Sequence, residues 1–307
     1  MKRFNKKQSL LFFYTMDFIL LLIFILLIIP FSRKTKNSSK KSALLNPKYK
    51  NSVEKIELNF PSESEAFSKN FTFYKKGNFW FGEMPVKNSV SSEFQITQNN
   101  DSDKIYFPLD NQTVNNMLEK FTLIVNMYKK SDSLADFSAF NLLENESICI
   151  LFYDSNNEIL SQIYFGKEDD FTSRIAFRIP NQNEVWETDN SFSVYINSQI
   201  SFWTDPFLEP QCITRYSRKE AESSLRHGKI VESFLPDDFV SSESLKKDFG
   251  NGNEILYEIF KSNSEIFVKA KFIPGSINSQ IEKNALQKVN YIYSISEWTY
   301  EKFLESF

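Results

Sequence analysis

The sequence predicts an α+β fold, in which an N-terminal transmembrane helix precedes antiparallel-sheet units with packed helices. Three observations support this prediction. An apolar run lies within the first 31 residues, short segments of alternating apolar and polar residues follow after residue 50, and one stretch near residue 120 has helical spacing. The 307 residues are 41% apolar and 16% aromatic, which is typical of a folded protein with one large domain or two ordinary ones.

Residues 1–31 form a basic segment followed by the predicted membrane anchor. Twelve apolar residues run without a break from Phe18 to Ile29, and Leu10–Met16 extends the stretch to about 20 residues, enough to cross ~30 Å of hydrocarbon. Asp17 lies near the helix end, where a carboxylate can reach the interface, and Pro30 marks the exit. The anchor residues that we single out are Phe18, Leu22, Ile25 and Ile29.

A cleaved secretory signal is the alternative interpretation of this segment. The basic residues before the apolar run fit it, but no small-x-small cleavage site follows Ile29, so we favour an uncleaved anchor. No cysteine follows the run, which excludes a lipoprotein anchor. Four basic residues precede the span and seven follow it before residue 51, against the positive-inside rule for an external domain. Long domains can translocate regardless of this charge, and we expect a single-pass protein of the cell membrane with its soluble part outside the cytoplasm.

Charge divides the chain into a basic N-terminal part and an acidic remainder. Residues 1–50 hold eleven Lys and Arg and one acid, which leaves 25 basic and 38 acidic residues after them, a formal charge of −13. Such an acidic body repels phosphate backbones and argues against nucleic-acid binding. The basic part suits anionic head groups. Residues 32–50 are polar and almost free of aliphatic side chains, so they predict a flexible tether.

Residues 51–210 predict an α+β domain. A helix is expected over Asp110–Tyr128, where apolar residues recur at helical spacing behind a possible Asp110 or Asn111 cap. Phe192–Leu208 predicts a strand or loop followed by a short helix. The expected strands are Val53–Phe60, a hairpin over Phe71–Phe81 that turns at Lys76–Asn78, a second hairpin of Ser147–Tyr153 with Glu158–Phe165, and Arg174–Ile179 and Glu184–Glu187.

A weak internal repeat predicts that residues 211–307 form a second, degenerate α+β unit. Ser155–Ile159 recurs as Ser262–Ile266, and each copy joins two apolar segments. The matching positions downstream are Phe165 with Phe272, Val194-Tyr195 with Ile292-Tyr293, and Trp203 with Trp298. Two echoes in the same order favour duplication over chance.

The order of these segments resembles a bacterial family catalogued as domain of unknown function 4340. The resemblance covers about residues 50–210, although the family's usual Tyr-Gly-Leu is here Phe140-Asn-Leu. It rests on Val53–Leu58, the hairpin ending Gly77–Trp80, the predicted helix, Phe140–Leu143, the hairpin into Tyr164–Lys167, Arg174–Trp186 and Phe202-Trp203. The resemblance implies a membrane-anchored accessory protein found beside gliding-motility-type ABC transporter components, and it brings no active-site residues.

Signals for catalysis, metals and cofactors are weak. His227 is the only histidine, in a polar stretch that predicts solvent exposure, and seven scattered glycines cannot build a phosphate cradle. Cys149 and Cys212 exclude a thiolate metal site by number; we expect Cys149 to be buried, and a disulfide between them stays open. The acidic run at residues 168–170 is typical of a solvated loop. No cofactor or metal is expected.

The aromatic stretch at residues 202–207 is denser than folding requires, so we expect a partner or ligand surface at Trp203, Asp205 and Trp298. The chain is predicted to be a non-enzymatic envelope protein, an accessory or binding subunit of a membrane complex such as an ABC transporter. One alternative is an envelope hydrolase that uses dispersed carboxylates on a glycan. A passive spacer or adhesin is the third interpretation.

Overall fold

A computed structural model describes Met16, Ile19–Leu21 and residues 38–61, 70–86, 104–215, 227–231, 240–262 and 265–307. Lys40–Phe307 forms one compact unit. In the part of the chain that is described, no helix is both long and apolar enough to span a membrane. The predicted anchor residues Phe18, Leu22, Ile25 and Ile29 lie outside the described residues, so the anchor stays a prediction.

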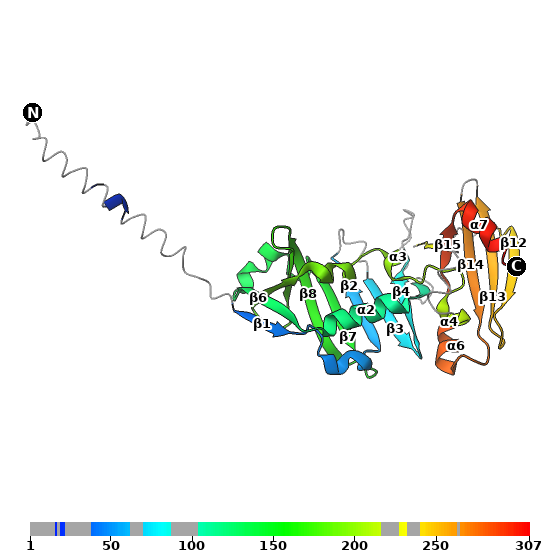
Figure 1. The fold of residues 1–307 in the computed structure, drawn as a ribbon, viewed down its shortest axis with the longest axis horizontal. Helices are drawn as coiled ribbons and strands as arrows, with labels where there is room; N and C mark the ends of the chain where they lie inside the picture. The colour runs from blue at the N-terminus through cyan, green and yellow to red at the C-terminus, as the bar shows by residue number, and fades with distance from the viewer. Residues whose placement is uncertain are drawn as a thin grey trace, which may run out of the picture. The chain divides into compact units, whose positions relative to one another are not determined.

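Ten strands form a large sheet in the order β1-β6-β10-β9-β8-β7-β2-β3-β4-β5 (Figure 1). At its centre β2 and β7 pair antiparallel, with Ile56 opposite Phe152. Two four-stranded meanders, β2–β5 and β7–β10, extend from this pair in opposite directions. The strands are β1 (Ser39–Ser42), β2 (Lys55–Asn59), β3 (Asn70–Lys76), β4 (Phe79–Pro85), β5 (Lys104–Pro108), β6 (Val125–Ser131), β7 (Ile148–Tyr153), β8 (Ile159–Asp169), β9 (Arg174–Arg178) and β10 (Val185–Asp189).

The predicted mixed class with mostly antiparallel sheets is confirmed, because helices accompany two sheets whose strands pair mostly antiparallel. Alternation places Phe73, Ile150 and Phe152 in the core and turns the residues between them to the other face. The hairpin of β3 and β4 turns at Gly77, whose φ of +65° suits glycine. The hairpin of β7 and β8 also lies where the sequence predicts it.

Helix α2 (Asn111–Thr122) packs its apolar side on the sheet, where the ring of Phe121 lies 5.2 Å from that of Phe152. The predicted Asp110 cap is present, since its carboxylate accepts a hydrogen bond from the backbone N–H of Gln112. The expected extension of the helix to residue 128 was wrong. The chain leaves the helix at Thr122 and enters β6, which pairs with β10, so Leu123 and Ile124 are exposed.

The expectation of a flexible tether is wrong for residues 39–50, because β1 and a 3₁₀ helix, η1 (Pro47–Ser52), account for most of them. Leu45 between them is 0% exposed, and its backbone N–H donates to the carbonyl of Phe121 over 2.8 Å. The two adjacent leucines Leu44 and Leu45 are buried and hold this otherwise polar segment on the core. Residues 32–37 lie outside the described residues.

The remaining 3₁₀ and α segments of this half are short. They are η3 (Leu134–Asp136), η4 (Ser138–Phe140), η5 (Asn190–Tyr195), α3 (Ile200–Trp203) and α4 (Gln211–Thr214). The first two lie over part of the sheet face opposite α2, where Phe137 and Leu142 pack against Ala176 of β9. The last three carry the chain toward a second sheet.

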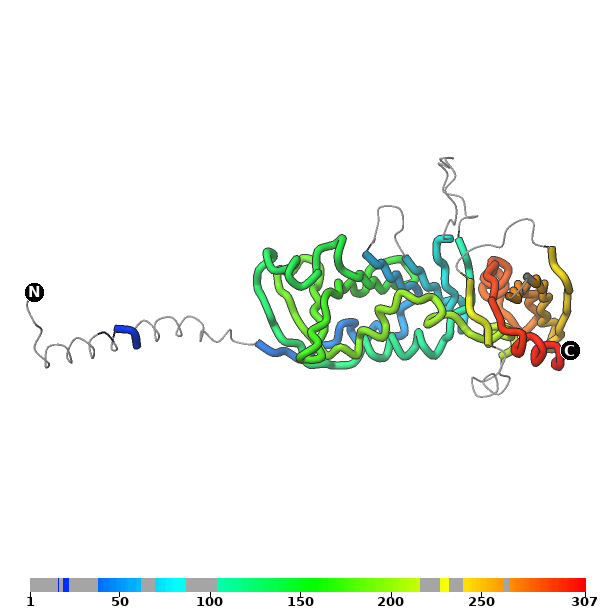
Figure 2. Tube along the Cα trace, turned by 90° about the horizontal axis from the view of Figure 1, so that it is seen from above, coloured from blue at the N-terminus to red at the C-terminus, as the bar shows by residue number. Residues whose placement is uncertain are grey.

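The second sheet has five strands in the order β11-β15-β14-β13-β12, and Figure 2 shows this yellow-to-red part of the chain beside the cyan strands that end the first sheet at β5. Asn290 joins the two sheets, since its side chain accepts from Tyr106 N–H (2.7 Å) and donates to the carbonyl of Lys104 (3.0 Å) on edge strand β5. The elements are β11 (Lys229–Ile230), β12 (Glu243–Asp248), β13 (Glu254–Ser262), β14 (Glu265–Ile273), α6 (Gln280–Leu286), β15 (Ile292–Ile295) and α7 (Glu297–Leu304).

The proposed repeat is matched only in its hairpin. The two turn segments both join paired strands, β7 with β8 and β13 with β14, and Phe165 and Phe272 are both buried. Downstream, Tyr195 lies in a 3₁₀ helix whereas Tyr293 lies in β15. The duplication of residues 51–210 in residues 211–307 therefore stays a prediction.

Candidate functional site

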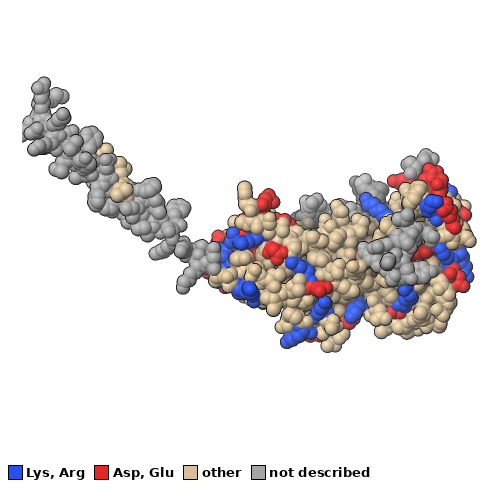
Figure 3. Space-filling model, viewed as in Figure 1, with Lys and Arg blue, Asp and Glu red and all other residues tan. Residues whose placement is uncertain are grey.

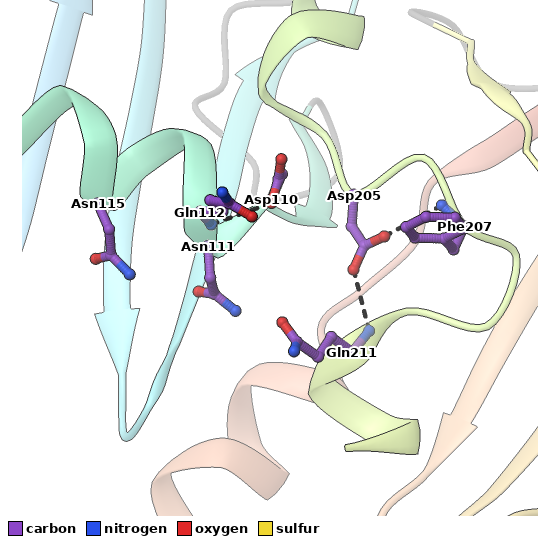
Figure 4. A pocket seen from close by; sticks show the side chains of 7 residues that line it. All are labelled: Asp110, Asn111, Gln112, Asn115, Asp205, Phe207 and Gln211. Carbon is purple, nitrogen blue, oxygen red and sulfur yellow. Dashed lines mark hydrogen bonds between the residues drawn. The ribbon is translucent and has the colours of Figure 1, made fainter. Parts of the chain in front are cut away.

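A pocket of about 260 Å³ opens where the N-terminal end of α2 faces the segment that leads to the second sheet (Figure 4). Its lining combines two carboxylates, four side-chain amides and one aromatic ring. The residues are Asp110, Asn111, Gln112, Asn115, Asp205, Phe207 and Gln211. The pocket therefore unites the cap of a helix with residues almost a hundred positions later in the sequence.

Backbone pairing brings the two sides of the pocket together. Leu109 and Thr204 form an isolated antiparallel bridge beyond the end of β5. On either side of it, the N–H of Asp110 donates to the carbonyl of Trp203 (2.8 Å), and the N–H of Asp205 donates to the carbonyl of Pro108 (3.0 Å). The positions of both aspartates are thus fixed by the main chain.

Both carboxylates are committed to local hydrogen bonds. That of Asp110 accepts from Gln112 N–H (3.0 Å) and from the Thr113 hydroxyl (2.7 Å). That of Asp205, which is buried, accepts from the N–H groups of Phe207 (3.1 Å) and Gln211 (3.0 Å). These bonds orient the turn before α4 and the first turn of α2, which is a structural role.

The second sheet also fixes the site. The hydroxyl of Tyr293 in β15 donates to the carbonyl of Asp205 and reaches that of Phe207 at 3.3 Å. The ring of Phe207 meets the ring of His227 edge-on at 4.8 Å, and Gly228 N–H donates to the carbonyl of Pro206 (2.8 Å). His227 is exposed, as the sequence predicts.

Four side-chain amides line the pocket beside the two carboxylates. Asn111 accepts from the N–H of Trp80 (2.8 Å) through Oδ1, which holds its side chain at the pocket. Gln112 and Asn115 are exposed on the same side of α2. Amide side chains offer both donors and acceptors without charge, so this lining suits a neutral hydroxyl- or amide-bearing group. No group of three metal-ligating side chains is found in the described part of the chain.

The three residues predicted to form a partner or ligand surface lie in three different places. Asp205 lines the pocket. Trp203 does not present a surface, and this expectation was wrong: it is 0% exposed, its ring lies 5.1 Å from that of Phe73, and its indole N–H donates to the carbonyl of Asn197. Trp298 is half exposed at the start of α7, away from the pocket. The aromatic density around residue 203 therefore serves the core.

Sequence reasoning missed the amides of α2. The signal was present, because Asn111 and Asn115 are four residues apart, share one side of the helix and closely follow the Asp110 cap. Nothing in the sequence placed that side opposite Asp205.

Cys149 and Cys212 are both buried and free, so the disulfide left open does not form, and burial raises the pKa of both thiols.

No model of a known protein family, no curated protein and no solved structure matches the chain. The resemblance to domain of unknown function 4340 stays a prediction. Figure 3 shows acidic and basic side chains interspersed on one face of the molecule, without a broad basic field there.

Proposed function

We propose that this chain is a non-enzymatic, membrane-anchored envelope protein whose folded unit binds a partner as an accessory subunit of a membrane complex such as an ABC transporter. One observation carries the binding role: both carboxylates of the pocket are committed to local hydrogen bonds, and the other polar side chains that line it are neutral amides. The apolar run at residues 18–29 supports the membrane location.

The pocket lining favours recognition over proton transfer. A general acid or base needs a carboxyl group that is available to the reacting atoms. Asp110 and Asp205 instead hold N–H groups of their own loops, so either one would have to release a structural bond to react. Neutral amides around an aromatic ring can bind a peptide group or a hydroxyl without such a cost.

Purification of the full chain from native membranes in mild detergent tests the proposal. We expect membrane subunits, including transporter components, to be recovered with it; repeated recovery of the chain alone would contradict the proposal. Asn115→Arg, which places a charge in the pocket, should reduce recovery. The matched control is Asn116→Arg, on the neighbouring exposed position of the same helix but outside the pocket.

A second candidate function rests on the presence of two carboxylates in one pocket. If the protein is an envelope hydrolase, Asp110 and Asp205 would be its acid and nucleophile or base. Incubation with cell-wall glycans should then release reducing ends, and Asp110→Asn and Asp205→Asn should each abolish the release. Our proposal expects no release from the wild-type chain.

A further inference from the structure

We propose that Arg178 is the centre of a carboxylate-binding site on the sheet face opposite α2. Arg178 ends β9, and only 7% of it is exposed. In the described part of the chain, no carboxylate oxygen forms an ion pair with it within 4.0 Å. Removing a guanidinium from water without an anionic partner costs free energy. An anion that binds to Arg178 would offset this cost.

The two other arginines among the described residues each lie beside a buried carboxylate. Arg174, on the same strand, lies 3.8 Å from the buried carboxylate of Glu187, and Arg215 lies 2.7 Å from that of Glu282. Arg178 is the exception, although it is largely buried. Its contrast with Arg174 four residues earlier argues that its partner is not a carboxylate of the described residues.

The guanidinium is held in place but keeps most of its donors. Its Nε–H donates to the carbonyl of Leu142 (2.7 Å), and its side chain also interacts with the hydroxyl of Tyr164. The ring of Tyr164 lies 3.6 Å from the guanidinium carbon and that of Phe137 lies 5.1 Å from it. Two aromatic contacts offset part of the desolvation and fix the plane, which leaves the Nη fork for a planar carboxylate.

Neighbouring polar side chains hold the guanidinium and the Tyr164 ring in place. The amide of Gln162 donates to the hydroxyl oxygen of Tyr164 over 2.7 Å, and also approaches the thiol of Cys149 at 3.6 Å. Side-chain hydrogen bonds also link the Tyr164 hydroxyl to the Cys149 thiol and to Arg178, so this hydroxyl helps to orient the guanidinium. Burial raises the pKa of Tyr164, which keeps this hydroxyl protonated.

The test uses the full chain in neutral detergent, with arginine side chains labelled with ¹⁵N. Sodium acetate and a short amidated peptide containing glutamate are titrated in, and sodium chloride at equal ionic strength is the salt control. We expect a saturable shift of the Arg178 Nε–H signal with the carboxylates and none with chloride. Tighter binding of the peptide would identify a protein side chain as the ligand, and tighter binding of acetate a small acid.

Variants sharpen the test. Arg178→Lys keeps the charge but loses the fork, and should weaken carboxylate binding at least tenfold, measured by the ligand-dependent rise in the unfolding temperature. Tyr164→Phe keeps the ring and removes the hydroxyl that helps to orient the guanidinium, so a smaller loss is expected. Arg174→Lys is the matched control and should bind normally. Absence of a saturable shift, or unchanged binding by folded Arg178→Lys, would overturn the proposal.

Discussion

At the scale of single residues, the sheet face opposite α2 is unusual for its tyrosines. Tyr74 of β3 lies there beside Glu83 and Glu57, and Tyr153 of β7 donates to Glu57 over 2.7 Å. Burial is the largest cause that raises the pKa of Tyr74 to about 12, and the charges of Glu83 and Glu57 add to it. This hydroxyl therefore keeps its proton in the folded state under conditions where the unfolded chain loses it.

The alkaline stability of the protein should reflect this shift. Because the folded pKa of Tyr74 is above the usual value of 10.0, its contribution is present below pH 10 and is lost as the pH rises through about 12. Tyr74→Phe should therefore lose less stability than wild type between pH 9 and about 11.5. Urea unfolding at a series of pH values measures this. Equal losses in both proteins would contradict the predicted role of Tyr74.

Gly166 of β8 is a second residue whose identity the packing dictates. A Cβ atom added there would lie 2.1 Å from the carbonyl oxygen of Phe140 and 2.9 Å from that of Asn141. Both are main-chain atoms, so Gly166→Ala should displace the segment that Arg178 contacts, and destabilise the fold by about 1–3 kcal/mol. Chemical denaturation measures the loss. Lys167→Ala, at the exposed neighbouring position, is the control and should change stability by no more than ~0.5 kcal/mol.

At the scale of elements, the sequence pattern predicted those features that neighbouring residues determine, such as turns and helix caps. The hairpin around Gly77 follows from alternation and a turn residue, and the cap at Asp110 follows from its side chain. The end of α2 could not be predicted, since Leu123 and Ile124 continue the apolar pattern and only the pairing of β6 with β10 removes them from the helix. Asp205 was predicted, but its partners on α2 were not, because backbone pairing brings them together across almost a hundred residues.

Edge strand β5 gives a prediction at this scale. Asn290 satisfies Tyr106 N–H and the carbonyl of Lys104, and its own N–H donates to the carbonyl of Tyr106 (3.1 Å). Asn290→Ala removes both side-chain hydrogen bonds to β5, those with Tyr106 N–H and with the Lys104 carbonyl. The expected loss in the free energy of unfolding is about 1–3 kcal/mol. Hydrogen exchange at Tyr106 should accelerate. Asn284→Ala, at an exposed position of α6, is the control. If this variant accelerates the exchange of Tyr106 N–H equally, the loss of the Asn290 side chain is not the cause.

At the scale of the whole molecule, the two sheets are joined at a second place by a buried charge. Glu282 of α6 accepts from the guanidinium of Arg215 (2.7 Å) and from Asn78 N–H (3.3 Å) in the β3–β4 turn. A Cβ at Gly77 would lie only 2.6 Å from the same carboxylate. The turn of the first sheet thus closes on a helix of the second, which explains why Lys40–Phe307 is one compact unit.

This contact makes the coupling of the two sheets sensitive to acid. Burial alone would raise the pKa of Glu282, but hydrogen bonds from Arg215, Asn78 and Ser279 outweigh it and lower that pKa below its usual 4.5. The stability it contributes is present above pH 4.5 and is lost as the pH falls through the folded pKa. Glu282→Gln should therefore lower the unfolding temperature by several degrees at pH 7, about 1–3 kcal/mol, and by much less near pH 3. Calorimetry across this range measures the difference, and a difference that stays constant with pH would show that the carboxylate charge does not join the sheets.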